Sequence, residues 1–165
     1  SENKEKVPEK KSKSGIIVKG LYDVAVHFSK CCSPVPGDEI VGFVTRGRGV
    51  SIHRTDCINI INLSDMERER LIDAEWQHDE ESGSSGLYLA EIKVFCNNRT
   101  GLLVDITRAF TERAIDINAI HSKTSKQGIA TIDISFNTKG KAELTSVIDK
   151  LRQIDSIIDI ERTTG

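Results

Sequence analysis

The sequence lacks the features that define several classes of protein. None of its apolar runs approaches the ~18–20 residues that a membrane-spanning helix needs, so we expect no membrane association. No secretory signal is visible either. Four cysteines among 165 residues do not suggest a disulfide scaffold, and we expect reduced thiols in the cytoplasm. The net charge of −2 gives no global attraction to nucleic acid.

Patterns of catalysis are missing as well. The sequence contains no pairing of a nucleophile with a base, no paired carboxylates and no phosphate-binding loop, and the stretches RGRG and NRTG are too short for nucleotide signatures. The first residue is Ser rather than Met, and an ordered pattern begins only near Gly15. We therefore expect a non-catalytic fragment of a longer protein.

Two stretches of low apolar content divide the chain. Residues 1–14, SENKEKVPEKKSKS, are highly charged, which predicts a disordered linker. Residues 78–86, HDEESGSSG, are acidic and then rich in glycine and serine, which predicts a flexible linker. Two folded units are expected as a result, at 15–77 and at 87–165.

The first unit reads as short strands. In YDVAVHF the residues Val24, Val26 and Phe28 alternate onto one face, and EIVGFVT and GVSIH flank RGRG as a hairpin would. DCINIINL predicts a short helix with Asp56 as a possible N-cap, and RLIDAEW predicts a closing strand. So small a unit has a small core and often needs a further constraint, such as a metal.

The second unit has the clearer periodicity. LYLAEIKVF alternates as a strand, and GLLVDITRAFTERA has helical spacing. IDINAIHSKTS and GIATIDISFN form a predicted hairpin around KQG, before the helix KAELTSVIDKLRQI and the strand SIIDIER. The order βαββαβ predicts a ferredoxin-like α+β domain, with a sheet face and edges available for dimerisation.

Three thiols and one imidazole form a sufficient ligand set for tetrahedral zinc: Cys31, Cys32, His53 and Cys57. The spacing of His53 and Cys57 is typical of half a site, whereas adjacent cysteines are unusual. Neighbouring residues of a strand face opposite ways, so both can bind one metal only if the backbone turns, and SPVPG supplies a turn. His27 is a possible substitute ligand. The open alternatives are a buried thiol beside a free one, or a redox pair.

The stretch VHFSKCCSPVPGDEIVGFVTRGRGVSIHRTDC resembles the conserved-cysteine module of the long RelA/SpoT enzymes, also called the zinc-finger or ribosome-intersubunit domain. The match runs through CC-x-P-x-PGD, the G-x-G turn and HR-x-DC. The second unit resembles the ACT domain that follows this module, so the resemblance covers about residues 20–165. The family synthesises and hydrolyses guanosine tetra- and pentaphosphate in domains upstream of such a fragment, and the resemblance implies Mg or Mn there and zinc here.

The resemblance also implies a place on the ribosome, against ribosomal RNA and near an uncharged tRNA. Residues 40–55 contain three arginines and no acid, so Arg46, Arg48 and Arg54 would meet phosphates. Lys30, beside the cysteines, is a weaker RNA candidate. The alternative is an ordinary solvated hairpin.

NNRTGLL resembles the ligand loop of amino-acid-sensing ACT domains, in which the ligand lies between two protomers. The resemblance implies ligand contacts from Asn98, Gly101, Leu102, Leu103 and Asp116, with a branched-chain amino acid as the expected ligand and a homodimer as the expected state. A helix N-terminus favours a carboxylate. The alternative is that Gly101 only lets the helix pack closely and the site is empty.

The leading hypothesis is thus a regulatory module that places a guanosine-phosphate enzyme on the ribosome and couples amino-acid state to its catalytic domains. A second hypothesis is the amino-acid-binding allosteric tail of a biosynthetic enzyme, in which the cysteine unit is structural. A third is a thiol enzyme that uses Cys31 or Cys32.

Overall fold

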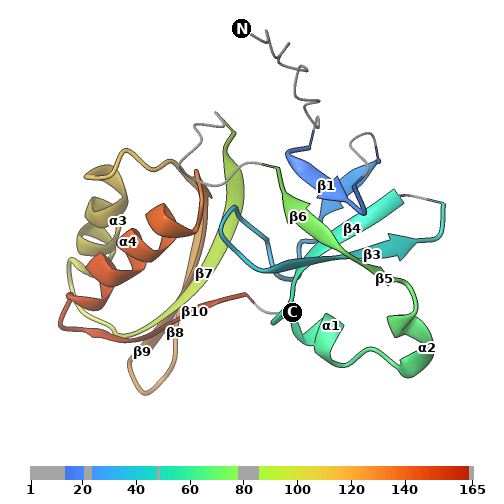
Figure 1. Ribbon diagram of the computed structural model, residues 1–165. Coiled ribbons are helices and arrows are strands. Elements are labelled where there is room, and N and C mark those ends of the chain that lie inside the picture. The colour runs from blue at the N-terminus through green and yellow to red at the C-terminus, as the bar shows by residue number, and fades with distance from the viewer. Residues whose placement is uncertain (1–13, 21–23, 48, 78–85, 164–165) are drawn as a thin grey trace, which may run out of the picture.

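The computed structural model describes residues 14–20, 24–47, 49–77 and 86–163. Apart from Ser14 and Gly86, the two expected linkers lie outside the described residues. Figure 1 shows two units, each built around its own four-stranded sheet. In the part of the chain that is described, no helix is long and apolar enough to cross a membrane.

The sheet of the first unit is made from four short strands. They lie in the order β2 (Val26–Phe28), β4 (Gly49–Arg54), β3 (Ile40–Thr45) and β5 (Leu71–Ile72). The expected hairpin is present, since β3 and β4 pair antiparallel from Ile40 opposite Arg54 to Thr45 opposite Gly49. The parallel pairing of β2 with β4 was not predicted.

The chain entering and leaving this unit forms a second, two-stranded sheet. Here β1 (Ile16–Val18) pairs antiparallel with β6 (Ala74–Trp76). The stretch RLIDAEW is therefore two strands in different sheets rather than the single closing strand that was expected. Val24, Val26 and Phe28 pack together against the same small core, as their alternation predicts.

Two single-turn helices, α1 (Ile58–Ile61) and α2 (Asp65–Arg68), follow β4. The N-cap of α1 is Cys57, which corrects the expectation for Asp56, because Asp56 is instead held by an arginine two residues earlier. In α2, Ser64 and Glu67 form a reciprocal capping box, which satisfies two amide groups that a helix start leaves unpaired.

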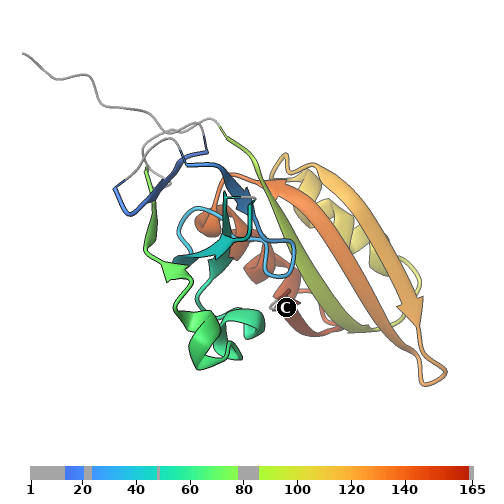
Figure 2. The ribbon, with the colours of Figure 1, turned by 90° about the vertical axis from the view of Figure 1, so that its right-hand side faces the viewer.

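The second unit has the expected ferredoxin-like α+β topology. Its elements along the chain are β7 (Tyr88–Asn97), α3 (Leu102–Thr111), β8 (Ile117–Thr124), β9 (Ile129–Thr138), α4 (Lys141–Arg152) and β10 (Ile157–Arg162). The strands lie antiparallel in the order β10-β7-β9-β8, and Figures 1 and 2 show both helices on one face. Alternate residues of β7 and β9 point into the core beneath these helices.

The two units pack against each other. Val35 belongs to the first unit in sequence, yet it is fully buried in the hydrophobic core of the second. On another side of the junction, Tyr88 of β7 meets Phe28 and Trp76 edge to face, with ring centroids 5.7 and 5.5 Å away. This packing fixes where the cysteines lie relative to the second sheet.

Candidate metal centre

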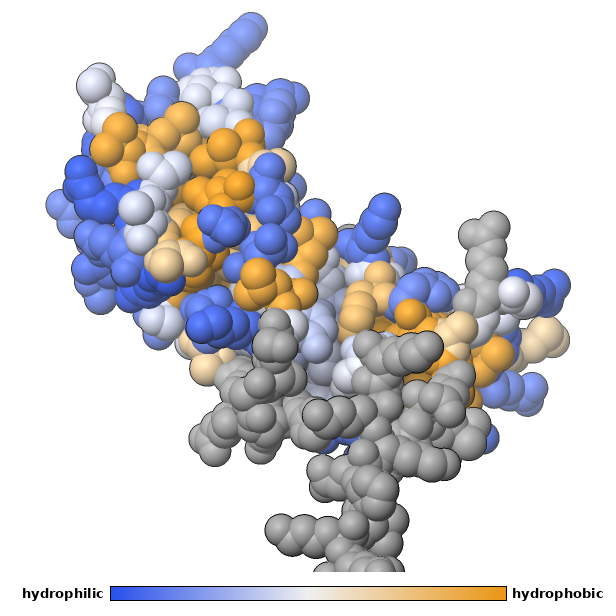
Figure 3. Space-filling view, turned by 90° about the horizontal axis from the view of Figure 1, so that it is seen from above, coloured by the Kyte–Doolittle hydropathy of each residue, from blue (hydrophilic) through white to orange (hydrophobic). Residues whose placement is uncertain are grey.

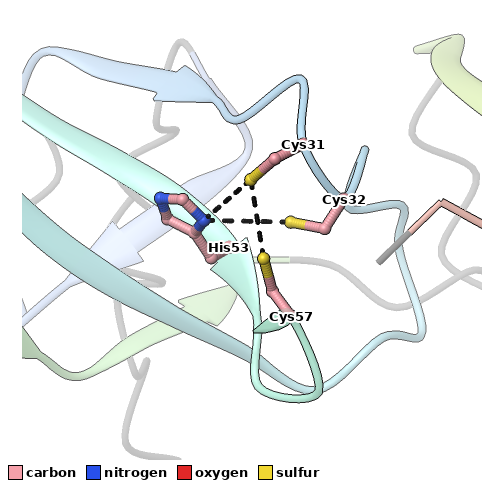
Figure 4. A group of neighbouring side chains, drawn as sticks. All are labelled: Cys31, Cys32, His53 and Cys57. Atoms are coloured by element: carbon pink, nitrogen blue, oxygen red, sulfur yellow. Dashed lines mark hydrogen bonds between the residues drawn. The ribbon is translucent and has the colours of Figure 1, made fainter. Parts of the chain in front are cut away.

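Four side chains from three segments converge in the first unit (Figure 4). Cys31 and Cys32 lie in the turn after β2, His53 in β4, and Cys57 at the start of α1. Their ligand atoms all lie within 4.8 Å of one another. These are the four residues predicted from the sequence, and the structure brings all of them together.

The separations fit a tetrahedral ion. Cys31 Sγ lies 3.5 Å from Cys57 Sγ and 3.4 Å from His53 Nδ1, and Cys32 Sγ lies 3.9 Å from His53 Nδ1. A tetrahedral zinc with its usual bond lengths holds two sulfurs about 3.8 Å apart, and a sulfur and a nitrogen about 3.6 Å apart. The donor set, thiolates with one imidazole, is also the one that zinc favours.

A turn solves the difficulty that adjacent cysteines pose. The amide of Ser33 donates to the carbonyl of Ser29 at 3.0 Å, which closes one helical turn around Cys31 and Cys32. Neighbouring side chains in a helical turn differ by about 100° rather than 180°, so both sulfurs can point inward. His27, the possible substitute, has an exposed side chain and is not in the cluster that the described residues form.

Hydrogen bonds orient the imidazole. His53 Nε2 lies 3.1 Å from the hydroxyl of Ser51, and that hydroxyl donates to the carbonyl of Phe43 at 3.4 Å. A hydroxyl that donates to a carbonyl accepts from Nε2–H, which leaves the lone pair of Nδ1 facing the sulfurs. Metal-binding histidines commonly have such a partner on the second nitrogen.

The sulfurs have their own partners. The hydroxyl of Ser29 lies 2.9 Å from Cys31 Sγ, and the amide of Arg54 donates to Cys32 Sγ at 3.3 Å. Burial raises the pKa of the Cys57 thiol, and raises that of Cys32 to about 12. Burial alone would also raise the pKa of Cys31, but hydrogen bonds from Ser29, Asn59 and the other two sulfurs outweigh it and lower that pKa.

Desolvation also acts on the imidazole. Burial, with a smaller contribution from the charge of His27, lowers the pKa of His53, so the ring is neutral at neutral pH and Nδ1 is available as a ligand. All four cysteines are free thiols. The cluster therefore contains no disulfide, and its three sulfurs and one imidazole could hold a metal ion.

The residues expected to contact RNA have different surroundings. Lys30 is exposed beside the cysteines and Arg46 is exposed at the β3–β4 turn, whereas Arg48 lies outside the described residues. Arg54 is at odds with the expectation, because it is buried and holds Asp56 in an ion pair of 2.8 Å. Asp56 lies directly after the acid-free stretch of residues 40–55, so the local charge around Arg54 is neutralised.

The expected ligand loop of the second unit precedes α3. Gly101 has φ +78° at the start of this helix, and Leu103 is exposed. The side chain of Leu102 is buried in the core, and its amide donates to the carbonyl of Arg99 at 3.3 Å. Sequence reasoning missed Arg99, whose guanidinium holds Asp105 at 2.6 Å and therefore ties the loop to the first turn of α3.

Asn98 and Asp116 do not meet within one chain. The backbone amide of Asn98 donates to the carbonyl of Gly128 at one end of β9, and the backbone carbonyl of Asp116 accepts from the amide of Asn137 at the other end. Those two partners, Gly128 and Asn137, are nine positions apart along an extended strand, a span of about 30 Å. A free amino acid cannot bridge that distance, so a site using both residues requires two copies of the chain.

Fold and site together define a two-domain protein in which a small cysteine/histidine cluster module packs against a ferredoxin-like domain. Comparison with known families gives the same division. Residues 16–77 match the RelA/SpoT RIS domain, and residues 84–162 match the ACT domain. The chain belongs to the RelA/SpoT family.

Two proteins similar to this chain bear the name GTP pyrophosphokinase. The chain is 38% identical over 167 residues to a GTP pyrophosphokinase of Escherichia coli strain K12, covering 99% of this chain and 22% of the relative. It is 39% identical over 151 residues to a GTP pyrophosphokinase of Streptomyces coelicolor, covering 92% and 17%. The chain thus spans about a fifth of the length of these relatives.

Among solved structures, the ACT domain from the GTP pyrophosphokinase of Chlorobium tepidum aligns with a TM-score of 0.42 and 27% identity, covering 47% of this chain and 99% of that one.

Proposed function

We propose that this chain is a non-catalytic regulatory region of a cytoplasmic stringent-response enzyme that synthesises or hydrolyses guanosine tetra- and pentaphosphate. The observation that carries the proposal is a RIS domain that contains a cysteine/histidine cluster and that packs directly against an ACT domain. Curated relatives bear the name GTP pyrophosphokinase. The pyrophosphate transfer, with Mg or Mn, then belongs to catalytic domains outside this chain.

Zinc is the ion we propose for the cluster of Cys31, Cys32, His53 and Cys57. Bound there, it supplies a cross-link between the turn after β2, strand β4 and the start of α1. The residues themselves provide three soft sulfur ligands and a neutral imidazole, at separations that fit a tetrahedral ion. Since the local core consists of only a few buried side chains, the cross-link would contribute much of the stability of this end of the module.

Elemental analysis of purified protein tests this proposal. We expect about one zinc per chain, in keeping with one four-ligand structural site, and its loss in Cys57→Ser. Cys96→Ser is the matched control, because Cys96 is also a buried free thiol but lies in the core of the ACT domain. Zinc content that is absent from the wild type, or equal in both variants, would remove the metal from the proposal.

Contact with ribosomal RNA and an uncharged tRNA is the second part of the proposal. Its support is that Lys30, beside the cluster, and Arg46, at the β3–β4 turn, are both exposed, together with Arg48 from the sequence. Each phosphate contact releases condensed counterions, so binding should weaken as salt rises. The buried Arg54 is left out of this surface.

Binding to ribosomes over a salt series tests the RNA contact. We expect Arg46→Gln to weaken binding and to reduce the slope of log K against log salt by about one, the loss of a single phosphate contact. Lys150→Gln, an exposed cation on α4 of the ACT domain, should bind as the wild type does. An unchanged slope in Arg46→Gln, or no binding even at low salt, contradicts the RNA contact.

The ACT domain provides the third part, a site for a branched-chain amino acid between two copies of the chain. A ligand changes the activity of the upstream domains only if it binds one arrangement of the protein better than another. The placement of Asn98 and Asp116 at opposite ends of the sheet supports a site shared by a homodimer.

A further inference from the structure

Arg54 occupies the junction between the metal centre and the ACT domain. It directly follows His53 in the chain, and it is only 5% exposed. Its guanidinium makes two bonds to Asp56, at 2.9 and 2.8 Å. A third nitrogen, Nη1, donates at 3.1 Å both to the carbonyl of Cys32 and to that of Thr163, just after β10. One side chain thus joins Cys32 of the cluster, and Asp56 next to Cys57, to the end of the ACT domain.

The backbone of Arg54 strengthens the link, because its amide donates to Cys32 Sγ at 3.3 Å. Cys32 is therefore held by Arg54 through both its sulfur and its carbonyl. A metal that fixed the distance between Cys32 and His53 would fix the same two residues that position the guanidinium. Without a metal, the sulfurs are connected only through weak thiol hydrogen bonds.

The segment after Cys32 is anchored in the ACT domain. Arg162 of β10 holds Asp38 through two bonds, of 2.7 and 2.9 Å, and donates to the carbonyl of Ser33 at 3.3 Å. The first amide of α4, that of Lys141, donates to the carbonyl of Pro36 at 2.7 Å. Movement of Cys32 would therefore be transmitted along a short, buried segment to β10 and α4.

We propose that Arg54 couples metal occupancy to the docking of the ACT domain, so that each stabilises the other. The inference rests on the proposed zinc site and adds a regulatory role to it: a change at the ACT domain alters the affinity for zinc, and loss of zinc loosens the ACT domain. Thermodynamic linkage requires the two effects to be equal in size.

Arginine suits this position because of its fixed fork of donors. Its four bonds leave from three separate nitrogens, Nε, Nη1 and Nη2, whereas an ammonium group has three donors on one nitrogen and cannot reproduce all four. Arg54→Lys keeps the positive charge beside Asp56 but loses the simultaneous contact with Cys32 and Thr163. This variant therefore tests the coupling without changing the charge at this position.

Hydrogen exchange of the amides at residues 157–163 tests the proposal, measured on the full chain with zinc bound and after chelation. In the wild type we expect chelation to speed exchange by about tenfold, within the usual range of coupling between sites. In Arg54→Lys the zinc effect should be clearly smaller than in the wild type, and the part that remains is carried by the segment after Cys32, which Arg162 and Lys141 hold. Arg70→Lys is the matched control, since Arg70 is a half-buried arginine that binds the carbonyl of Val44 at 2.9 Å within the first unit, and it should retain the full zinc effect.

The comparison of two states separates coupling from a merely structural role, because a structural role would speed exchange equally with and without zinc. A zinc effect of the same size in Arg54→Lys and in the wild type overturns the coupling and leaves the metal site intact. A wild type that binds no zinc by elemental analysis overturns both. In that case faster exchange in Arg54→Lys than in the wild type would still show the contact between the domains.

Discussion

Ser51 decides which nitrogen of His53 faces the sulfurs. Its buried hydroxyl connects Nε2 to the carbonyl of Phe43, so the proton stays on Nε2 and the lone pair on Nδ1. Removing the hydroxyl frees the ring to exchange tautomers or rotate, and either change costs metal affinity without removing a ligand.

We expect Ser51→Ala to weaken zinc binding by at least about tenfold, the usual effect of losing such a partner. Competition with a chromophoric chelator measures the affinity. Ser135→Ala is the control, since Ser135 is a half-buried strand residue in the ACT domain and should leave zinc binding unchanged. Equal affinities in Ser51→Ala and the wild type would show that the ring is held by packing alone.

Single residues also mark the limit of sequence reasoning. The four candidate ligands could be predicted because their chemistry is visible in the residue types. The turn was expected in SPVPG at residues 33–37, whereas the turn that lets Cys31 and Cys32 converge comes just before it, at residues 29–33. Arg54 was misplaced because its surroundings come from Cys32 and from Thr163, 109 residues further along. Local charge counting carries no information about such distant partners.

At the scale of elements, Gly47 in the turn after β3 and Gly49 at the start of β4 have similar backbones and different surroundings. Gly47 has φ +75° and Gly49 has φ +87°, both in the left-handed region that disfavours other residues. A Cβ at Gly47 would meet nothing, whereas a Cβ at Gly49 would collide with the carbonyl of Ala25. That carbonyl accepts the bond from Val50 that joins β4 to the chain before β2.

The pair gives a matched stability test. Gly47→Ala should cost about 1–2 kcal/mol of unfolding free energy from backbone strain alone. Gly49→Ala should cost about 3 kcal/mol or more, because strain is added to a displaced strand. Urea unfolding followed by the fluorescence of Trp76, the only tryptophan, measures both. Equal costs would mean that the chain around Ala25 and β2 moves away from the new Cβ at no cost in stability. That result would contradict the predicted effect of the collision.

The two units differ in how far their elements could be predicted. In the ACT domain, long strands and amphipathic helices repeat with clear periods, and their neighbours in the sheet follow from a common topology. In the RIS domain, β1 and α2 were missed and β5 and β6 were merged. Strands of two or three residues are too short to show a period, and β1 pairs with β6 across the whole module.

At the scale of the molecule, the RIS domain and a second copy would use opposite edges of the ACT sheet. The RIS domain is bound to β10 through Arg162, whereas β8 is the outer strand at the other edge, and most of its residues are exposed. Figure 3 shows further apolar surface on the ACT part of the molecule, on the left of the view. A homodimer formed through the β8 edge would therefore leave the junction with the metal centre undisturbed.

Complementation between variants tests whether an amino-acid site is shared by two copies. Asn98 and Asp116 lie at opposite ends of one sheet, so a shared site takes Asn98 from one copy and Asp116 from the other. Asn98→Ala and Asp116→Ala should each abolish leucine binding in calorimetry. Mixed after unfolding and refolding together, they form hybrid dimers, in which one site has both mutations and the other has neither. Since about half of the dimers are hybrids, we expect about a quarter of the wild-type sites to return, with unchanged affinity at each.

Each variant refolded alone is the control and should recover no binding. A mixture that binds no leucine, although the wild type binds it, would mean that the two residues do not act in a common site.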